Sequence, residues 1–147
     1  MSRFDAGGWS GVEIGSEYEA VKASLAASKI AFEEAKLHKD GTRLLKPKRA
    51  GFTSNTIYFE WNATEKTDRV SQLTFVKENA SQSEATRALT ELEKQYGPAA
   101  EKTGPRAMDS STETTRVWKN PKTTLKLTVR LYKDGTMSVF ENWGRPS

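Results

Sequence analysis

The feature that most constrains the fold is a strictly alternating apolar run followed by a turn signal. Apolar residues occupy every second position from Leu125 to Leu131, which is the pattern of a β-strand with one buried face. Asp134-Gly135 follows directly, and this dipeptide favours a two-residue hairpin turn. Such a turn would place Lys133 opposite Thr136 and fix the register of the next strand.

This register predicts which C-terminal side chains face the core and which face outward. Val129 and Phe140 would lie opposite each other on an inner face that helices cover. The outer face would carry Lys126, Arg130, Tyr132, Met137, Val139 and Trp143. An antiparallel sheet can leave one face in water, but such a face does not require this many large side chains. They predict a binding surface, or else a minor core of cross-strand pairs.

The same alternation with a period of two indicates three more strands, one of them in the last third of the chain. Residues 53–61 alternate and are followed by a polar turn over 62–68. Residues 69–77 form the second strand, with Leu73 and Phe75 on its inner side. These two strands predict an antiparallel hairpin. Residues 114–120 precede the alternating run as another strand.

Two helices are expected, each beginning at a serine followed by glutamate three residues later. Ser16 with Glu19, and Ser81 with Glu84, match the capping box, in which each side chain accepts a hydrogen bond from the other residue's backbone N–H. The first helix is predicted over 16–28 and the second from 81 to Gly97. Their buried stripes are Tyr18, Val21 and Leu25, and Ala85, Leu89, Leu92 and Tyr96.

Three segments give weaker signals. Residues 30–50 fit either a continued helix or a strand pair, and Asp40-Gly41 within them is a hairpin signal. Residues 1–15 are expected to form an N-terminal arm and turn. Residues 99–113 are small and polar, which predicts a mobile loop.

These elements fit one domain over residues 1–147, a length suited to a single core. The predicted fold class is α+β: an antiparallel sheet of about five strands with two helices packed on one face.

Composition excludes several kinds of chemistry. The chain has no cysteine and a single histidine, His38, so disulfides, thiolate nucleophiles and metal sites built from several histidines are excluded. Gly7–Gly11 lacks the spacing of a nucleophile elbow because Val12 stands where glycine is required. No phosphate-binding glycine motif occurs. We therefore expect a protein that is not an enzyme and that uses no metal or cofactor.

Positive charge is concentrated in two blocks, although the net charge is only +4. The first spans residues 36–50 and the second residues 116–133, and the second contains no acidic residue. Such blocks suit an anionic partner such as a nucleic acid, or they are solvated faces of strands and loops.

The segment from Gly11 to Ser16, followed by Val21 and Leu25, resembles the opening of small secreted or periplasmic modules. These include the SmpA/BamE outer-membrane assembly lipoproteins and β-lactamase inhibitory protein. The run Leu89–Pro98, followed by a strand with Trp118, is similar to uncharacterised periplasmic proteins. The resemblance implies a helical layer on an antiparallel sheet that grips another protein.

The functional expectation is a protein-binding module of the bacterial envelope or secreted space, with an inhibitory role as one form. The alternative is a basic protein that binds nucleic acid or another anionic surface through an aromatic and basic sheet face. No signal peptide and no apolar run long enough to span a membrane are visible. A cytoplasmic location therefore stays open beside the periplasmic or secreted one.

Overall fold

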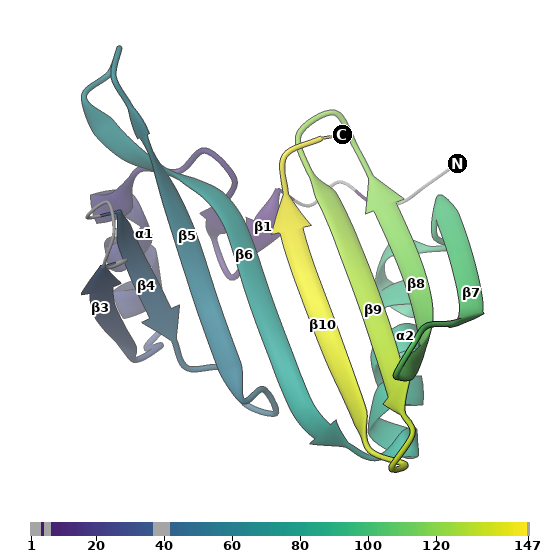
Figure 1. Ribbon diagram of the computed structural model, residues 1–147. Helices are drawn as coiled ribbons and strands as arrows, with labels where there is room; N and C mark the ends of the chain where they lie inside the picture. Colours follow the sequence, from purple (N-terminus) through teal and green to yellow (C-terminus); the bar gives the residue numbers. More distant parts are fainter. Residues whose placement is uncertain (1–3, 5–6, 37–41, 147) are drawn as a thin grey trace.

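The computed structural model describes Phe4 and residues 7–36 and 42–146 (Figure 1). One antiparallel sheet of eight strands dominates it, with strand order β3-β4-β5-β6-β10-β9-β8-β7, and β1 and β2 form a separate pair. In chain order the elements are β1 (Gly8–Trp9), β2 (Val12–Glu13), α1 (Tyr18–Ala27), β3 (Phe32–Lys36), β4 (Arg43–Pro47), β5 (Ser54–Asn62), β6 (Thr67–Ala80), α2 (Gln82–Tyr96), β7 (Glu101–Ala107), β8 (Ser111–Lys119), β9 (Thr124–Tyr132) and β10 (Met137–Gly144).

The chain builds the same arrangement twice. A first half runs from α1 through β3, β4, β5 and β6, and a second half runs from α2 through β7, β8, β9 and β10. The last strand of each half, β6 or β10, lies in the middle of the sheet, and these two strands pair antiparallel. The two halves therefore share one continuous sheet that is joined along a central seam.

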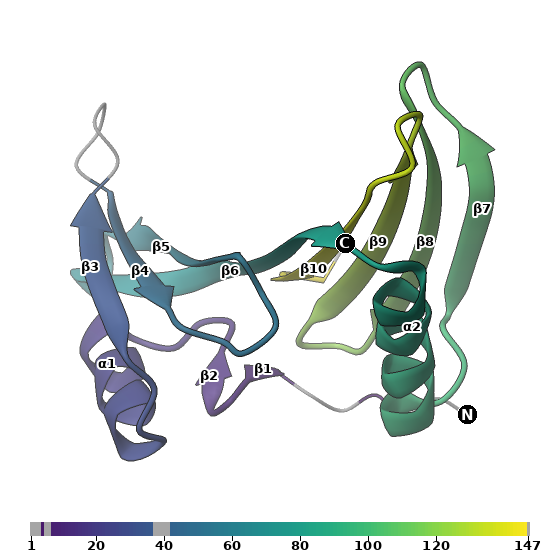
Figure 2. The ribbon, with the colours of Figure 1, turned by 90° about the horizontal axis from the view of Figure 1, so that it is seen from below.

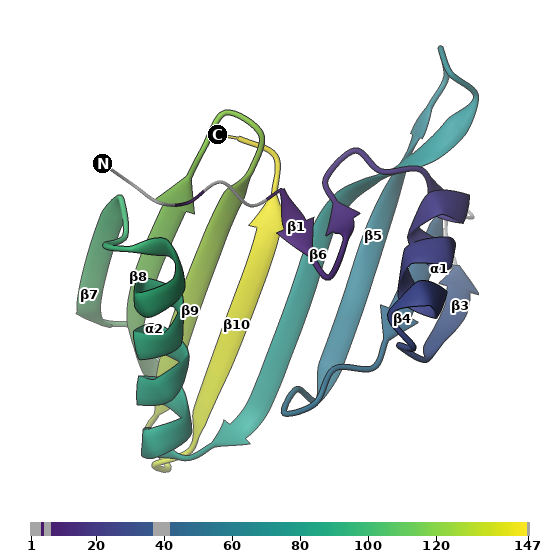
Figure 3. The ribbon, with the colours of Figure 1, turned by 180° about the vertical axis from the view of Figure 1, so that it is seen from behind.

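Both helices lie on the same side of this twisted sheet, with the β1–β2 hairpin between them (Figures 2 and 3). The buried cluster on that side contains large fully buried side chains from both halves, among them Phe75, Leu25 and Trp118. On the opposite side, no helix or strand of the described residues covers the sheet (Figure 1).

The predicted number of strands, about five, is wrong, because the main sheet has eight and the chain is mostly β. The antiparallel pairing and the two helices are confirmed. The additional strands come from the weak segments. Residues 32–36 and 43–47 form β3 and β4, and the expected loop over 99–113 instead contains β7 and the start of β8.

These three strands were hard to detect because two of them are sheet edges. β7 is exposed at every residue, and β3 is exposed at Glu33, Glu34 and Lys36. Strands at an edge carry charge and proline, which protect them from pairing with other chains. The Asp40-Gly41 signal lies outside the described residues.

The two helix starts differ from each other. At α2 the capping box is confirmed: Ser81 Oγ accepts from the Glu84 N–H at 3.1 Å, and Glu84 Oε1 accepts from the Ser81 N–H at 3.1 Å. At α1 the predicted box is wrong. The N-cap is Glu17, without a side-chain cap, and Ser16 Oγ instead accepts from the Glu13 N–H at 3.3 Å.

The turn between β9 and β10 has three residues rather than two. The Tyr132 N–H donates to the Thr136 carbonyl at 2.8 Å, which leaves residues 133–135 as the loop. Gly135 has φ of 89°, the left-handed conformation that closes three-residue hairpins and that glycine adopts without strain. Met137 therefore pairs with Leu131, one position away from the predicted register.

This one-residue difference exchanges the two faces of β10 but not those of β9. Leu125 and Leu127 are buried against the helices, as predicted, and Trp143 and Glu141 lie beside them. Phe140 was predicted to face the core, but it pairs with Thr128 on the opposite side. Register shifts of one residue always have this consequence, because side chains alternate along a strand.

An ion pair joins the two halves on the helix side. Arg49, in the β4–β5 loop, lies 2.6 Å from Glu141 on β10, whose carboxylate also accepts from the Trp143 indole N–H at 2.9 Å. The Arg49 guanidinium also packs over Phe52 and Phe75, at 4.2 and 4.5 Å from the ring centroids. Because Glu141 is only 4% exposed, these partners replace the water that its carboxylate loses on burial.

Candidate functional site

We call the sheet surface opposite α1 and α2 the open face. The strand registers place three aromatic side chains on it, all half-buried: Tyr58, Tyr132 and Phe140. Around them lie mainly hydroxyl and amide side chains, including Thr56, Gln72, Thr74, Thr128, Ser138 and Asn142. The open face is thus a polar surface with aromatic side chains on β5, β9 and β10.

The structure divides the six predicted site residues into two groups. Alternation along β9 places Lys126, Arg130 and Tyr132 together on the open face, as predicted. The predicted outward position is wrong for the three residues of β10. Val139 and Trp143 are 1% and 3% exposed, and Met137 packs against the core cluster. The three-residue turn is the physical reason.

An ordered group occupies the open face of the second half. Arg130 Nε donates to Glu113 Oε2 at 3.0 Å, and the Arg130 guanidinium lies 4.8 Å from the centroid of the Phe140 ring. The hydrogen bond with Glu113 raises the pKa of Arg130, and Tyr132 acts in the same direction. We call Glu113, Arg130, Tyr132 and Phe140 the platform.

Side chains next to the platform are buried although no element covers them. Thr128, the cross-strand partner of Phe140, is 5% exposed, and Ser138, the partner of Arg130, is 6% exposed. The large platform side chains therefore cover Thr128 and Ser138. A surface that is already ordered loses little side-chain entropy when it binds, which favours affinity.

A hydrogen-bonded polar group lies at the central seam. Thr74 Oγ1 donates to Asn142 Oδ1 at 2.9 Å, and Gln72 Nε2 donates to Thr74 Oγ1 at 3.0 Å. These residues come from β6 and β10, so the seam is held on the open face by side chains as well as by the backbone ladder.

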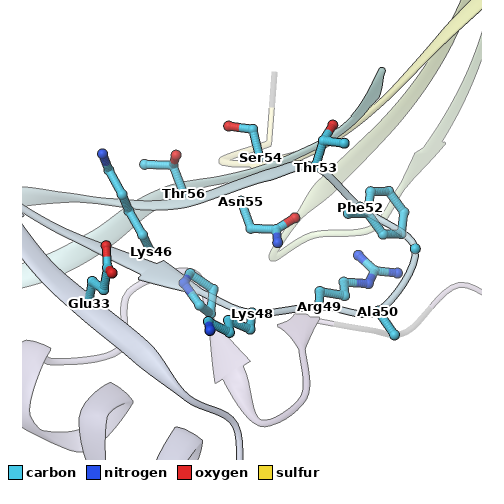
Figure 4. Close-up of a pocket in the computed structure, with 12 residues that line it drawn as sticks. Glu33, Lys46, Lys48, Arg49, Ala50, Phe52, Thr53, Ser54, Asn55 and Thr56 are labelled. Atoms are coloured by element: carbon cyan, nitrogen blue, oxygen red, sulfur yellow. The ribbon is translucent and has the colours of Figure 1, made fainter. Parts of the chain in front are cut away.

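A pocket of about 670 Å³ opens at the end of β4 and β5 (Figure 4). The two strands pair at Leu44–Tyr58 and at Leu45–Ile57, and in the described chain no further pair joins them. Past this point they separate, and the loop of residues 48–53 connects them. The lining includes Lys46, Lys48 and the side chain of Asn55.

The two basic blocks are partly neutralised by the fold. In the second block, Arg116, Lys119 and Arg130 form ion pairs with Glu93, Glu101 and Glu113. In the first block, Arg43 pairs with Asp68 and Arg49 with Glu141. Because the acids lie outside the two blocks, the count of charges within each block did not reveal this neutralisation. The cations are therefore less available to an anionic partner than their spacing suggested.

Sequence reasoning missed Phe140 as a surface residue and missed the pocket. Asp-Gly also fits a three-residue loop with glycine at its left-handed position, so the alternative register was available from the sequence. The pocket had no such signal, because residues 43–47 had not been assigned to a strand.

Neither helix in the described part of the chain is long and apolar enough to cross a membrane. Within those same residues, no group of three or more His, Cys, Asp or Glu side chains gathers as a metal site. His38 lies outside the described residues. No family model matches the chain, and no curated protein or solved structure matches it.

Proposed function

We propose that this chain is a protein-binding module that docks another protein on the open face through the platform. The observation that carries the proposal is the half-buried, ordered group of Arg130, Tyr132 and Phe140 on the side of the sheet that no helix or strand of the described residues covers (Figure 1). Arginine and tyrosine are among the residues that most often dominate binding energy at protein interfaces.

The alternative, nucleic-acid binding, has weaker support. Binding to phosphates requires cations that are free to replace counterions, whereas Arg130 is paired with Glu113 on the open face. Lys126 is the exposed cation beside the platform, and it stands next to neutral side chains such as Asn142. The proposed location, periplasmic or secreted, is supported by the resemblances of the N-terminal segment and of the run Leu89–Pro98.

The test begins with capture of a partner from the source cells, followed by purification of that partner and titration calorimetry. Phe140→Ala and Arg130→Ala should each weaken binding by about 2 kcal/mol, the size expected for an interface hot spot. Arg87→Ala is the matched control, because Arg87 is 79% exposed on α2, on the other side of the sheet. Its affinity should match that of the wild type.

Two further measurements complete the test. Circular dichroism should show the same fold for all three variants. Affinity should also change little between about 50 and 200 mM salt, whereas binding to phosphates would fall steeply over this range. Wild-type affinity in both Phe140→Ala and Arg130→Ala would show that the platform is not the binding site.

A further inference from the structure

The pocket at the end of β4 and β5 combines free cations with an interrupted strand ladder. Lys46 and Lys48 are both exposed and both line the pocket, and among the described residues neither has an ion pair within 4 Å. Glu33, on the neighbouring β3, pairs in register with Lys46 and offsets part of its charge. The lining therefore keeps an excess of positive charge.

The second observation is an unsatisfied acceptor. Asn55 Oδ1 is buried and accepts no hydrogen bond from the described residues, and its side chain points from β5 toward the loop of residues 48–50 (Figure 4). A buried polar atom without a partner costs about 1–3 kcal/mol, so such atoms are rare in folded proteins and call for an explanation. Because this atom is closed to solvent, a ligand reaches it only by widening the gap between β4 and β5, and a hydrogen-bond donor on such a ligand would supply the missing partner.

An extended peptide is a ligand that can supply both a hydrogen-bond donor for Asn55 and negative charge for the lysines. Its backbone N–H groups are donors for Asn55, and strand edges that have separated are sites where an extended chain adds by main-chain hydrogen bonds. Asp or Glu side chains on the same peptide would pair with Lys46 and Lys48. The hydroxyl groups of Ser54 and Thr56, which also line the pocket, suit a polar ligand of this kind.

We infer that the β4–β5 pocket receives an extended acidic segment of the partner protein. The inference rests on the proposed function, to which it adds a second contact site and the chemistry of the segment that fills it. The platform and the pocket belong to different halves of the sheet. Lys46 and Thr56 lie on the open face, where a partner that spans the sheet contacts them, whereas Asn55 lies on the helix side and is reached through the gap between β4 and β5.

The experiment uses a library of random heptapeptides displayed on phage and selected against the full-length chain at low salt. Selected peptides should be enriched in Asp and Glu. A synthetic peptide from the selection is then titrated by fluorescence anisotropy. In ¹⁵N spectra of the full chain, its resonance shifts should be confined to residues 46–56 and the strands beside them.

Variants test the two observations separately. The double variant Lys46→Gln/Lys48→Gln should weaken peptide binding about tenfold, whereas Glu33→Gln should tighten it about threefold. The control Lys122→Gln/Lys133→Gln removes two exposed charges outside the pocket and should bind as the wild type does. Asn55→Ala should weaken binding while the free energy of unfolding stays the same or rises, because the variant removes an unpaired acceptor.

Selected peptides without acidic enrichment, or equal binding by Lys46→Gln/Lys48→Gln and wild type, would overturn the inference. Oligothymidine that bound the pocket more tightly than the peptide would also overturn it. Failure here is distinguishable from failure of the proposed function. If the double lysine variant keeps full affinity for the purified partner and Phe140→Ala loses it, the platform stands without the pocket.

Discussion

The two halves of the molecule repeat one arrangement but hold their helices by different means. In the first half, α1 has ten residues and no side-chain cap, yet Tyr18, Val21 and Leu25 are all buried. In the second half, α2 has fifteen residues and a complete capping box, yet only Ala85 and Tyr96 of its residues are buried. Leu89 and Leu92, in its apolar stripe, are half-buried.

The difference shows that local signals and tertiary packing substitute for each other. A short helix is marginal by itself and depends on burial of its apolar face, which is the condition of α1. The longer α2 gains from its cap and its length, so it tolerates partial cover. Strong local signals in a sequence therefore do not identify the element that contributes most to the core.

The largest expected effect tests this contrast directly. Leu25→Ala removes a side chain that is 0% exposed, and should lower the free energy of unfolding by about 3–4 kcal/mol. Leu89→Ala, at the half-buried position of α2, should lower it by about 1–2 kcal/mol. Guanidinium denaturation measures both values. Equal losses would show that the two helices contribute equally to the core.

A smaller effect concerns the caps. Ser81→Ala removes the side-chain acceptor of the α2 capping box and should cost about 1 kcal/mol. Ser16→Ala is the matched change at the start of α1, where the serine does not cap the helix, and it should cost less. The same denaturation experiment compares them. If Ser16→Ala lowered the free energy of unfolding more than Ser81→Ala, the side-chain cap would matter more at α1 than at α2, contrary to this assignment.

The smallest effect is a pH dependence of the α2 start. A hydrogen bond from Lys77, followed by those from Ser81, lowers the pKa of Glu84 to about 2 from its ordinary 4.5. Because the unfolded chain binds this proton more readily, the contribution of Glu84 to stability is complete above pH 4.5 and is lost as the pH falls toward 2.

Denaturation of the wild type and of Glu84→Gln at several pH values measures this dependence. The difference in free energy of unfolding between them should shrink as the pH falls from 6 to 2. Arg87→Gln, which lies outside the capping box, controls for general acid effects. A difference that stays constant over this range would show that Glu84 keeps its ordinary pKa in the folded protein.

The sequence predicted the elements with strong periodicity and failed where contacts beyond the local segment decide the structure. α2, the hairpin of β5 and β6, and the inward face of β9 follow from the period of apolar residues and from the Ser81 cap. The edge strands β3 and β7 carry little apolar alternation, because an exposed edge does not require it.

The candidate site shows how sensitive such predictions are to one turn. Lys126, Arg130 and Tyr132 were placed correctly because they share a strand with an unbroken alternation. The β10 residues depended on the length of the loop before them, and Asp134-Gly135 is compatible with two lengths. Trp143 was therefore predicted as a binding residue, although it is part of the core and donates to Glu141.

The position of Arg49 couples the β4–β5 loop to the packing of the two halves of the sheet. The same six-residue connection carries Lys48, which lines the pocket, and Arg49, whose guanidinium reaches across the seam to Glu141. Any occupant that favours one arrangement of this connection also favours one packing of the two halves, and thermodynamic reciprocity makes the converse equally true. Binding at the pocket and binding at the platform, which share no residue, would then be coupled through the buried carboxylate of Glu141.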